Sequence, residues 1–388
     1  CKAFAARGLL KSKGRLRVRC KIILSGDAIR SNYQTFKALV APSIAIPIIK
    51  SNAYGHGLKE VLAALKPDHP PWLGVNYLSE AEDLRAEDYK GRILVVGPLS
   101  SPQVKRAGEL DLDIFLVEPE MLETWFQEKK RPKAHLKIDT GMSRQGFLPE
   151  EISDLIPRLK AVQENLVGVC SHFSNVEDVL SQSYALQQLA TFEQVTAQLK
   201  AEGFVNLMEH ISASSSALIM PKARFALSRI GISLYGLWPS RTNQLSFMQS
   251  QSEKIELKPV MQWMTEVAIT KKVNAGQFIG YGCTYKALRD MRIAVLPVGY
   301  YEGYPRLASN RGHVLIHGEQ CPIVGRICMN MMMVDTTHLK DVKVGTPVTL
   351  IGTDGSETIE ASTIGDWAET IHYEIVTQLN PAIPKVLR

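Results

Sequence analysis

From about residue 40 the chain alternates between two kinds of segment. Short apolar, β-branched runs are followed by polar turn residues and then by stretches whose apolar residues recur every three or four positions. The runs predict strands and the stretches predict helices. Eight runs precede residue 240: Ile44–Lys50, Trp72–Asn76, Arg92–Gly97, Leu112–Val117, Ala134–Thr140, Leu166–Phe173, Glu209–Ser214 and Phe225–Tyr235. The helical stretches include Ser79–Ala86, Glu150–Gln163 and Leu180–Glu202. This alternation predicts an α/β fold with a parallel sheet.

The number and spacing of these strands predict a (β/α)8 barrel of the TIM type over residues 22–240. A doubly wound open sheet is the alternative, because the count alone fits both folds. After Trp238 the rhythm changes, and residues 240–258 are polar and without a strong period. We interpret them as a linker.

Beyond this linker the pattern becomes one of short alternating runs separated by Gly, Pro and Asp. The runs are Met261–Lys272, Arg292–Val298, Gly312–His317, Cys321–Cys328 and Thr346–Ile351. No long helical pattern intervenes until about Glu360. Residues 241–388, linker included, are therefore predicted to hold a mostly β, mostly antiparallel C-terminal domain.

The composition is that of a globular protein, with 45% hydrophobic and 22% charged residues. No apolar run is long enough to cross a bilayer. The net charge is +6, yet residues 1–21 alone contain eight Lys or Arg and no acid. The basic character thus belongs to an N-terminal arm, which we interpret as a solvated tail and not as a nucleic-acid or membrane contact.

The six cysteines form no CxxC pair, and several lie in apolar stretches. They are interpreted as free, buried thiols and not as a disulfide framework. Ala3-Phe4-Ala5 has the A-x-A form of a signal-peptide cleavage site. Export to the periplasm is therefore the alternative to a cytoplasmic location.

The most informative segment is the apolar run Ile44–Ile49, which leads directly into Lys50. Catalytic side chains project from the C-terminal ends of strands in parallel α/β folds. Partial desolvation there lowers the pKa of a lysine and makes its neutral amine available for a Schiff base with a carbonyl cofactor. Tyr54 and the glycines beside it could then form a turn around a phosphate. A lysine that merely caps a strand is the alternative.

The string K-S-N-A-Y-G-H-G at residues 50–57 closely resembles the K-A-N-A-Y-G-H-G motif of the alanine racemase family. The resemblance extends from about residue 22 to Arg388 and includes the barrel followed by a β domain. It implies an isomerase that interconverts L- and D-alanine and supplies D-alanine for peptidoglycan. It further implies pyridoxal 5'-phosphate (PLP) on Lys50, no metal, a small amino-acid substrate, and a homodimer with shared active sites.

A second match is the segment from His135 to Arg144. The resemblance implies that Lys137 is carbamylated and that its new negative charge pairs with Arg144, which binds the substrate carboxylate through its planar fork. Taken from the residues alone, a salt bridge between Lys137 and Asp139 is the alternative. His172 matches a histidine close to the cofactor ring that orients a catalytic tyrosine; otherwise it is a core histidine.

The stretch from Ser214 to Gly236 resembles the family's phosphate and pyridine-nitrogen region. The resemblance implies phosphate contacts from Tyr54, Ser214, Gly231, Ile232 and Tyr373. Arg229 would face the pyridine nitrogen and hold it unprotonated, which weakens the ring as an electron sink and disfavours transamination. Ala213 departs from the usual Asn, so one polar contact is absent or replaced by Ser212 or Ser215.

In the C-terminal part, Tyr281 aligns with the family's second catalytic base, which reaches the site from the other subunit. Tyr300 matches the tyrosine at the site entrance, and Met329 matches the residue whose backbone N–H contacts the substrate. Asn330 replaces the usual Asp and removes a negative charge near the site. Lys50 and Tyr281 would serve opposite faces of one carbon.

Three rivals share parts of this pattern. A broad-specificity amino-acid racemase is favoured by Asn330 and by the signal-like segment, but Lys137 is more typical of alanine-specific members. A non-catalytic PLP-binding barrel protein would end after the barrel, whereas this chain continues to Arg388. A barrel-type amino-acid decarboxylase would rely on a cysteine-bearing C-terminal motif, and Tyr281 fits the racemase pattern better.

Overall fold

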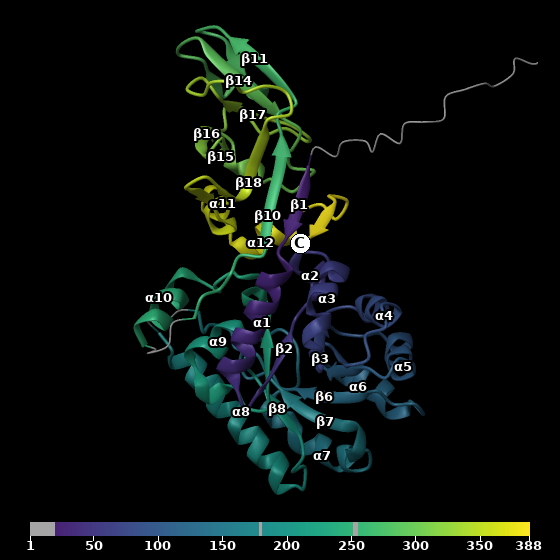
Figure 1. Cartoon of the computed structure of the whole chain (residues 1–388). Helices are drawn as coiled ribbons and strands as arrows, with labels where there is room; N and C mark the ends of the chain where they lie inside the picture. Colours follow the sequence, from purple (N-terminus) through teal and green to yellow (C-terminus); the bar gives the residue numbers. More distant parts are fainter. Residues whose placement is uncertain (1–19, 178–180, 251–254) are drawn as a thin grey trace, which may run out of the picture. The chain divides into compact units, whose positions relative to one another are not determined.

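The computed structural model in Figure 1 describes residues 20–177, 181–250 and 255–388. The predicted basic arm, except for its last two residues, and the Ala3-Phe4-Ala5 segment lie outside the described residues. The chain divides into two compact units. The barrel unit comprises Ile23–Gln262, Glu360–Pro381 and Lys385–Arg388, and the β unit comprises Trp263–Ile359 with residues 20–22 and Ala382–Pro384. These units interleave along the chain, whereas the predicted division at residue 240 follows sequence order.

Eight parallel strands close into a ring in the barrel unit. Strands β3 to β8 form a six-stranded sheet, and β2 pairs with β9. Bridges between Ile48 and Gly74 and between Ala213 and Arg229 join this pair to both edges of the sheet. The strands are β2 (Ile44–Pro47), β3 (Trp72–Val75), β4 (Arg92–Val95), β5 (Asp113–Leu116), β6 (Lys133–Lys137), β7 (Leu166–Cys170), β8 (Met208–His210) and β9 (Leu227–Ile230). The barrel prediction is confirmed, and the open doubly wound sheet is wrong because this ring has no free edge.

Helices surround these strands and follow the predicted pattern. In α8, buried Ala185, Leu189, Phe192, Val195 and Leu199 recur every three or four residues and form one apolar face. The predicted helical stretches correspond to α4, α7 and α8, although α4 begins one residue before the predicted stretch. The helices are α1 (Gly26–Val40), α2 (Lys50–Tyr54), α3 (Leu58–Leu65), α4 (Leu78–Ala86), α5 (Ser101–Glu109), α6 (Pro119–Gln127), α7 (Ile152–Lys160), α8 (Ser183–Ala201), α9 (Ser214–Ile219), α10 (Arg241–Ser250), α11 (Ala361–Trp367) and α12 (His372–Thr377).

Helix α10 corrects the interpretation of residues 240–258 as a linker. Its sequence is mostly polar and has no strong apolar period, yet Asn243 and Phe247 are buried. Phe247 packs beside Trp238, and the Asn243 side chain donates to the Glu177 carbonyl at 3.2 Å. Two buried side chains, one apolar and one hydrogen-bonded, thus hold a helix that a periodicity argument does not detect.

The β unit is built from antiparallel pairs, as predicted. One sheet has the strand order β11-β14-β17. Its side chains Val273, Met291 and Ile293 are part of the hydrophobic core cluster of this unit. The strands of the β unit and chain ends are β1 (Lys21–Leu24), β10 (Met261–Glu266), β11 (Ile269–Val273), β12 (Phe278–Ile279), β13 (Tyr285–Lys286), β14 (Met291–Leu296), β15 (His313–Ile316), β16 (Glu319–Pro322), β17 (Met332–Asp335), β18 (Pro347–Asp354), β19 (Glu357–Ile359) and β20 (Lys385–Leu387). Six of these strands lie outside the predicted runs, namely β1, β12, β13, β17, β19 and β20.

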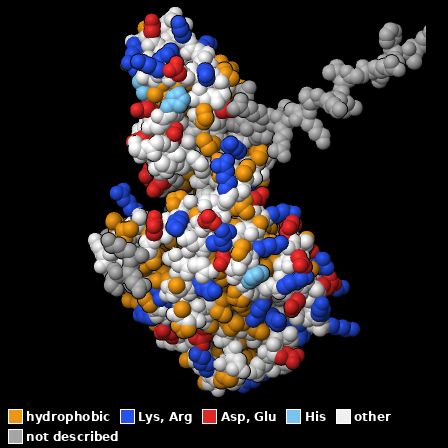
Figure 2. All heavy atoms as spheres, in the orientation of Figure 1, with side chains coloured by type: hydrophobic (Ala, Val, Ile, Leu, Met, Phe, Trp, Pro, Cys, Tyr) orange, Lys and Arg blue, Asp and Glu red, His pale blue; other side chains and the backbone are white. Residues whose placement is uncertain are grey.

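The described surface is chemically mixed. On the face drawn in Figure 2, Lys and Arg side chains of the barrel unit are interspersed with Asp and Glu. The cysteines within the described residues are free; Cys170 and Cys321 are buried as predicted, whereas Cys283 is exposed. None of the described helices combines the length and apolar character that crossing a bilayer would need.

Candidate active site

Lys50 opens helix α2 just beyond the C-terminal end of β2. The four residues after it, Ser51 to Tyr54, all have left-handed backbone, with φ between +51° and +56°. This conformation costs an L-amino acid roughly 1–2 kcal/mol per residue. None of the four is glycine, so contacts from the surroundings must hold the turn.

Glu80, at the start of α4, supplies part of this support. Its carboxylate accepts the backbone N–H of Asn52 at 3.2 Å, of Asn76 at 2.9 Å and of Tyr77 at 3.1 Å. The Asn52 side chain in turn accepts the N–H of Leu58 at 2.9 Å. Glu80 therefore ties the lysine turn to the neighbouring helix. The sequence analysis missed Glu80, although an acid in the first turn of a predicted helix is the usual mark of such a cap.

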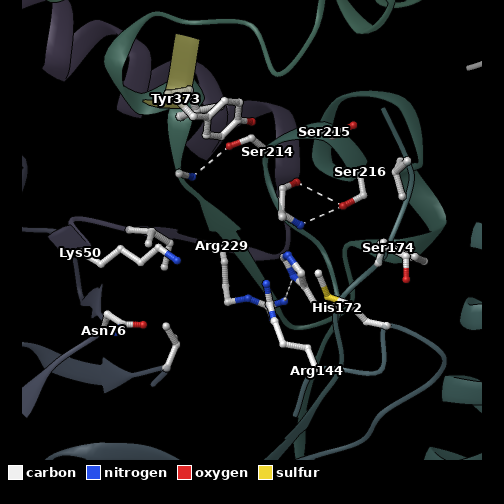
Figure 3. A pocket seen from close by; sticks show the side chains of 18 of the residues that line it. Lys50, Asn76, Arg144, His172, Ser174, Ser214, Ser215, Ser216, Arg229 and Tyr373 are labelled. Carbon is white, nitrogen blue, oxygen red and sulfur yellow. Dashed lines mark hydrogen bonds between the residues drawn. The ribbon is translucent and has the colours of Figure 1, made fainter. Parts of the chain in front are cut away.

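Lys50 faces a cavity of about 680 Å³ within the barrel unit, a size suited to a small molecule. Figure 3 shows Lys50 on one side of this cavity, with Arg229, His172 and Arg144 opposite. Most predicted site residues line it, namely Lys50, Tyr54, Lys137, Arg144, His172, Ser214, Arg229, Gly231, Ile232 and Tyr373. The barrel thus gathers two amines, two guanidinium groups and several hydroxyls around one space.

The amine of Lys50 is in an environment that favours its neutral form. Burial lowers its pKa, and the positive charges of Arg144 and Arg229 lower it further, against an opposing effect from Glu80. A neutral amine is the reactive form of lysine toward a carbonyl group. The prediction of a desolvated strand-end lysine agrees with this environment.

One end of the cavity is shaped for an anion. The Gly231 N–H donates to Ser214 Oγ at 2.9 Å, directly before the 3-10 turn Ile232–Tyr235. A Cβ at position 231 would lie 2.6 Å from the Tyr54 hydroxyl oxygen, so only glycine keeps this space open. The Tyr54 and Tyr373 rings lie 6.5 Å apart. Hydroxyls and backbone N–H groups around such a gap are typical of a phosphate site.

Arg229 lies on β9 with its guanidinium buried. It donates to His210 Nδ1 at 2.5 Å, to the Ser171 carbonyl at 2.8 Å and to His172 Nδ1 at 3.2 Å. Burial lowers the pKa of Arg229 to about 10, which leaves it charged at neutral pH. Burial and the adjacent Arg229 charge hold the pKa of His172 well below its usual value, so its imidazole is neutral.

Lys137, at the end of β6, is buried, and burial lowers its pKa to about 7. Asp139 does not neutralise it through the alternative salt bridge, since no ion pair joins the two side chains in the described part of the chain. The Asp139 carboxylate instead accepts the N–H groups of Gly141, Met142 and Ser143 at 2.9, 2.9 and 3.1 Å. This arrangement shapes the loop that leads to Arg144.

The departure at Ala213 is accommodated locally. Its backbone N–H donates to Ser216 Oγ at 2.8 Å, and Ser215 Oγ donates to Asn243 Oδ1 at 2.5 Å. Asn243 comes from the unpredicted helix α10, so no sequence pattern connected it with this site. The serines after Ala213 therefore supply polar contacts in this region.

Three predicted site residues lie on the β unit: Tyr281, Tyr300 and Met329. They are not among the described residues that line the cavity. They are 72%, 44% and 55% exposed. Asn330 donates to Glu302 at 2.8 Å, and Glu302 also accepts the Gly299 N–H at 2.8 Å. An Asp at 330 would repel Glu302, so Asn330 stabilises the turn that bears Tyr300.

Comparisons with known proteins agree with this architecture. Residues 24–239 match the family model "Alanine racemase, N-terminal domain", and residues 260–387 match "Alanine racemase, C-terminal domain". The chain is 37% identical to the alanine racemase of Leptospira interrogans over 369 residues, covering 94% of this chain and 95% of that protein. It is 34% identical to that of Symbiobacterium thermophilum over 366 residues, covering 92% and 94%.

Solved structures are similarly close. A crystal structure of alanine racemase from D-cycloserine producing Streptomyces lavendulae has a TM-score of 0.89 at 29% identity, covering 96% of this chain and 98% of that one. The alanine racemase of Bacillus anthracis with bound L-Ala-P has a TM-score of 0.88 at 29% identity, covering 97% and 96%. The match beyond residue 260 argues against the rival that ends after the barrel.

Proposed function

The chain belongs to the alanine racemase family, and from that premise we propose that it interconverts L- and D-alanine with PLP held at Lys50. The observation that supports this most directly is the cavity itself. It combines a desolvated strand-end amine with a hydroxyl- and N–H-lined anion pocket and a buried guanidinium.

The residues around the cavity fit PLP in three places. Tyr54, Ser214, Gly231, Ile232 and Tyr373 would hold its phosphate, Lys50 would bond to its carbonyl carbon, and Arg229 would face its pyridine nitrogen. When bound, PLP withdraws electrons from an attached amino acid and makes its Cα–H acidic. Because Arg229 remains charged at neutral pH, it would keep the ring nitrogen unprotonated and limit side reactions.

The proton transfers are assigned to Lys50 and Tyr281 on opposite faces of the substrate. Arg144 would bind the substrate carboxylate, the Met329 N–H would contact the substrate, and Tyr300 would lie at the entrance. Because Tyr281 is exposed on the β unit, we propose that a second subunit supplies it in a homodimer. Because His172 Nδ1 accepts from Arg229, neutral His172 carries its proton on Nε2, and would donate it to the tyrosine oxygen and so orient the tyrosine. The product would serve peptidoglycan synthesis.

We propose that the neutral amine of Lys137 adds to the carbon of CO2, one C=O bond opening to a carboxylate oxygen and one amine proton leaving to solvent, and that the resulting carbamate pairs with Arg144. Its buried amine has a pKa of about 7, so the nucleophilic neutral form dominates above that pH and is lost below it. We expect the intact mass to include one extra CO2 at alkaline pH and to lose it on acidification. Lys137→Ala should raise KM for alanine roughly tenfold, as expected for one charge-assisted bond.

Lys133→Ala is the matched control, because Lys133 lies on the same strand as Lys137. Its side chain is partly exposed, and its Nζ lies 3.6 Å from Asp111 Oδ1. It should leave both mass and KM unchanged. An unmodified Lys137 at every pH, with KM unaffected in Lys137→Ala, would contradict the carbamate.

The function is tested by racemisation rates over a panel of L-amino acids with added PLP. We expect kcat/KM for alanine to exceed that for arginine, lysine and serine, since Lys137 and Arg144 both line the site. Comparable values for alanine and a basic amino acid would favour the broad-specificity alternative and direct attention to Asn330. Release of CO2 in place of racemisation would favour the decarboxylase.

A further inference from the structure

Five side chains form a continuous series of hydrogen bonds that begins at the cavity and runs into the barrel core. In order they are Arg229, His210, His135, Asp113 and Arg92, and we call them the barrel relay. Of these five residues, only Arg229 is among those that line the cavity. His210, His135 and Asp113 are at most 1% exposed. Buried groups of this kind are costly unless each is hydrogen-bonded.

Successive members of the barrel relay are in contact. Arg229 Nη1 lies 2.5 Å from His210 Nδ1, and His210 Nε2 lies 2.9 Å from His135 Nδ1. His135 Nε2 lies 3.4 Å from Asp113 Oδ1. Arg92 donates to both carboxylate oxygens of Asp113, with Nε at 3.1 Å from Oδ2, and stacks on the Trp72 ring at 3.9 Å.

The donor and acceptor chemistry of these groups allows only one direction for the hydrogen bonds of the barrel relay, from Arg229 toward Asp113. A guanidinium N–H can only donate, so His210 Nδ1 must accept and its proton must sit on Nε2. That proton is donated to His135 Nδ1, which places the His135 proton on Nε2, facing Asp113. Burial lowers the pKa of both histidines, so each carries one proton. Burial opposes ionisation of Asp113, but hydrogen bonds from His135 and Arg92 outweigh it and lower its pKa.

The strand between the two histidines is shaped for their contact. Gly168 on β7 pairs with His135 in register. A Cβ at Gly168 would lie 2.0 Å from His135 Nδ1 and 2.7 Å from its Cε1. Gly168 has no left-handed backbone that would otherwise require glycine. The missing side chain therefore leaves the space through which His135 reaches His210.

The barrel relay also stabilises the buried positive charge of Arg229. Its other partners are neutral carbonyls and the His172 ring, and no carboxylate contacts it in the described ranges. The two neutral imidazoles connect it to the Asp113 carboxylate. A polarised chain of this kind stabilises a buried charge without direct ion pairing.

We propose that Asp113, His135 and His210 are positioning residues that fix the tautomers behind Arg229 and hold its guanidinium in place at the cavity. The role of Arg229 toward PLP rests on the proposed function. The barrel relay itself is testable without the cofactor.

The first test is imidazole 15N NMR on full-length protein with its nine histidines labelled, assigned with single His→Gln variants. At neutral pH, with and without PLP, His135 and His210 should each show a protonated Nε2 and an unprotonated Nδ1. A proton on Nδ1 of either ring would overturn the proposal, whether or not the protein racemises alanine.

The second test compares Asp113→Asn with Ser43→Ala in the PLP-loaded protein. Ser43 is a buried polar control whose hydroxyl bonds the Ser228 hydroxyl and the Arg224 carbonyl and is hydrogen-bonded to no side chain of the barrel relay in the described residues. Asp113→Asn should lower kcat about tenfold, as for other residues that orient a functional group, leave KM for alanine unchanged and alter the visible absorption of PLP. Ser43→Ala should change none of these.

Equal behaviour of the two variants would overturn the proposal. If Asp113→Asn does not fold, the NMR result on the wild-type chain decides. A wild-type protein that neither binds PLP nor racemises alanine would overturn the proposed function and leave the tautomer result to stand or fall by itself.

Discussion

Lys50→Ala is expected to abolish both alanine racemisation and the visible absorption of the protein after PLP is supplied. Lys50 is assigned two roles, covalent attachment of the cofactor and proton transfer on one face. A general base alone contributes typically ~10²–10⁴-fold, so the combined loss in kcat should lie at or beyond the upper end of that range. Activity and absorption spectra measured side by side give the result.

The matched control is Lys59→Ala, which removes an exposed lysine that pairs with Glu87 on the same unit. It should retain activity and colour. Borohydride reduction of the wild-type protein followed by peptide mapping should label Lys50. A label on another lysine, or full activity in Lys50→Ala, would contradict the cofactor assignment.

Tyr281→Phe is expected to keep PLP but lose at least ~10²-fold in kcat, because only the hydroxyl is removed. Tyr285→Phe is the control, since Tyr285 packs against the core cluster of the β unit and has no assigned role. Retained cofactor absorption separates a catalytic loss from a binding loss. Comparable turnover in the two variants would remove Tyr281 from the mechanism.

Mixing Lys50→Ala with Tyr281→Phe tests whether the site is shared. If each subunit contributes Tyr281 to the other, a mixed dimer contains one intact site. Random exchange at equal amounts should then restore about a quarter of wild-type activity, because half the dimers are mixed and each has one working site. Activity is measured against mixing ratio. Proven subunit exchange without rescue would mean that both residues act within one chain.

Much of the barrel could be predicted because its determinants are local. Each predicted strand is an apolar run, and Lys50 stands at the end of such a run, where parallel strands present reactive groups. The left-handed turn after Lys50 could not be predicted, because its residues have no intrinsic preference for it. The turn depends on Glu80, which is distant in sequence and meets Asn52 only after folding.

The barrel relay and helix α10 escaped prediction for a related reason. Asp113, His135 and His210 each interrupt an apolar run and look like isolated polar residues in the sequence. Their meaning comes from the register that brings three strands together and from Gly168 between them. Helix α10 depends on two buried side chains, Asn243 and Phe247, which is too few to give a period.

The return of the chain to the barrel unit at Glu360–Pro381 has a consequence for biosynthesis. Gly55, in the turn after Lys50, is packed against Val376 of α12, and Tyr373 of the same helix lines the cavity. All eight barrel strands leave the ribosome more than a hundred residues earlier, which at roughly 5–20 residues per second is on the order of ten seconds. During this interval the nascent barrel has its strands and Lys50 but lacks Tyr373, one of the residues proposed to hold the cofactor phosphate. We expect cofactor capture to follow translation, with the barrel's open cavity exposed to chaperones until the last helices arrive.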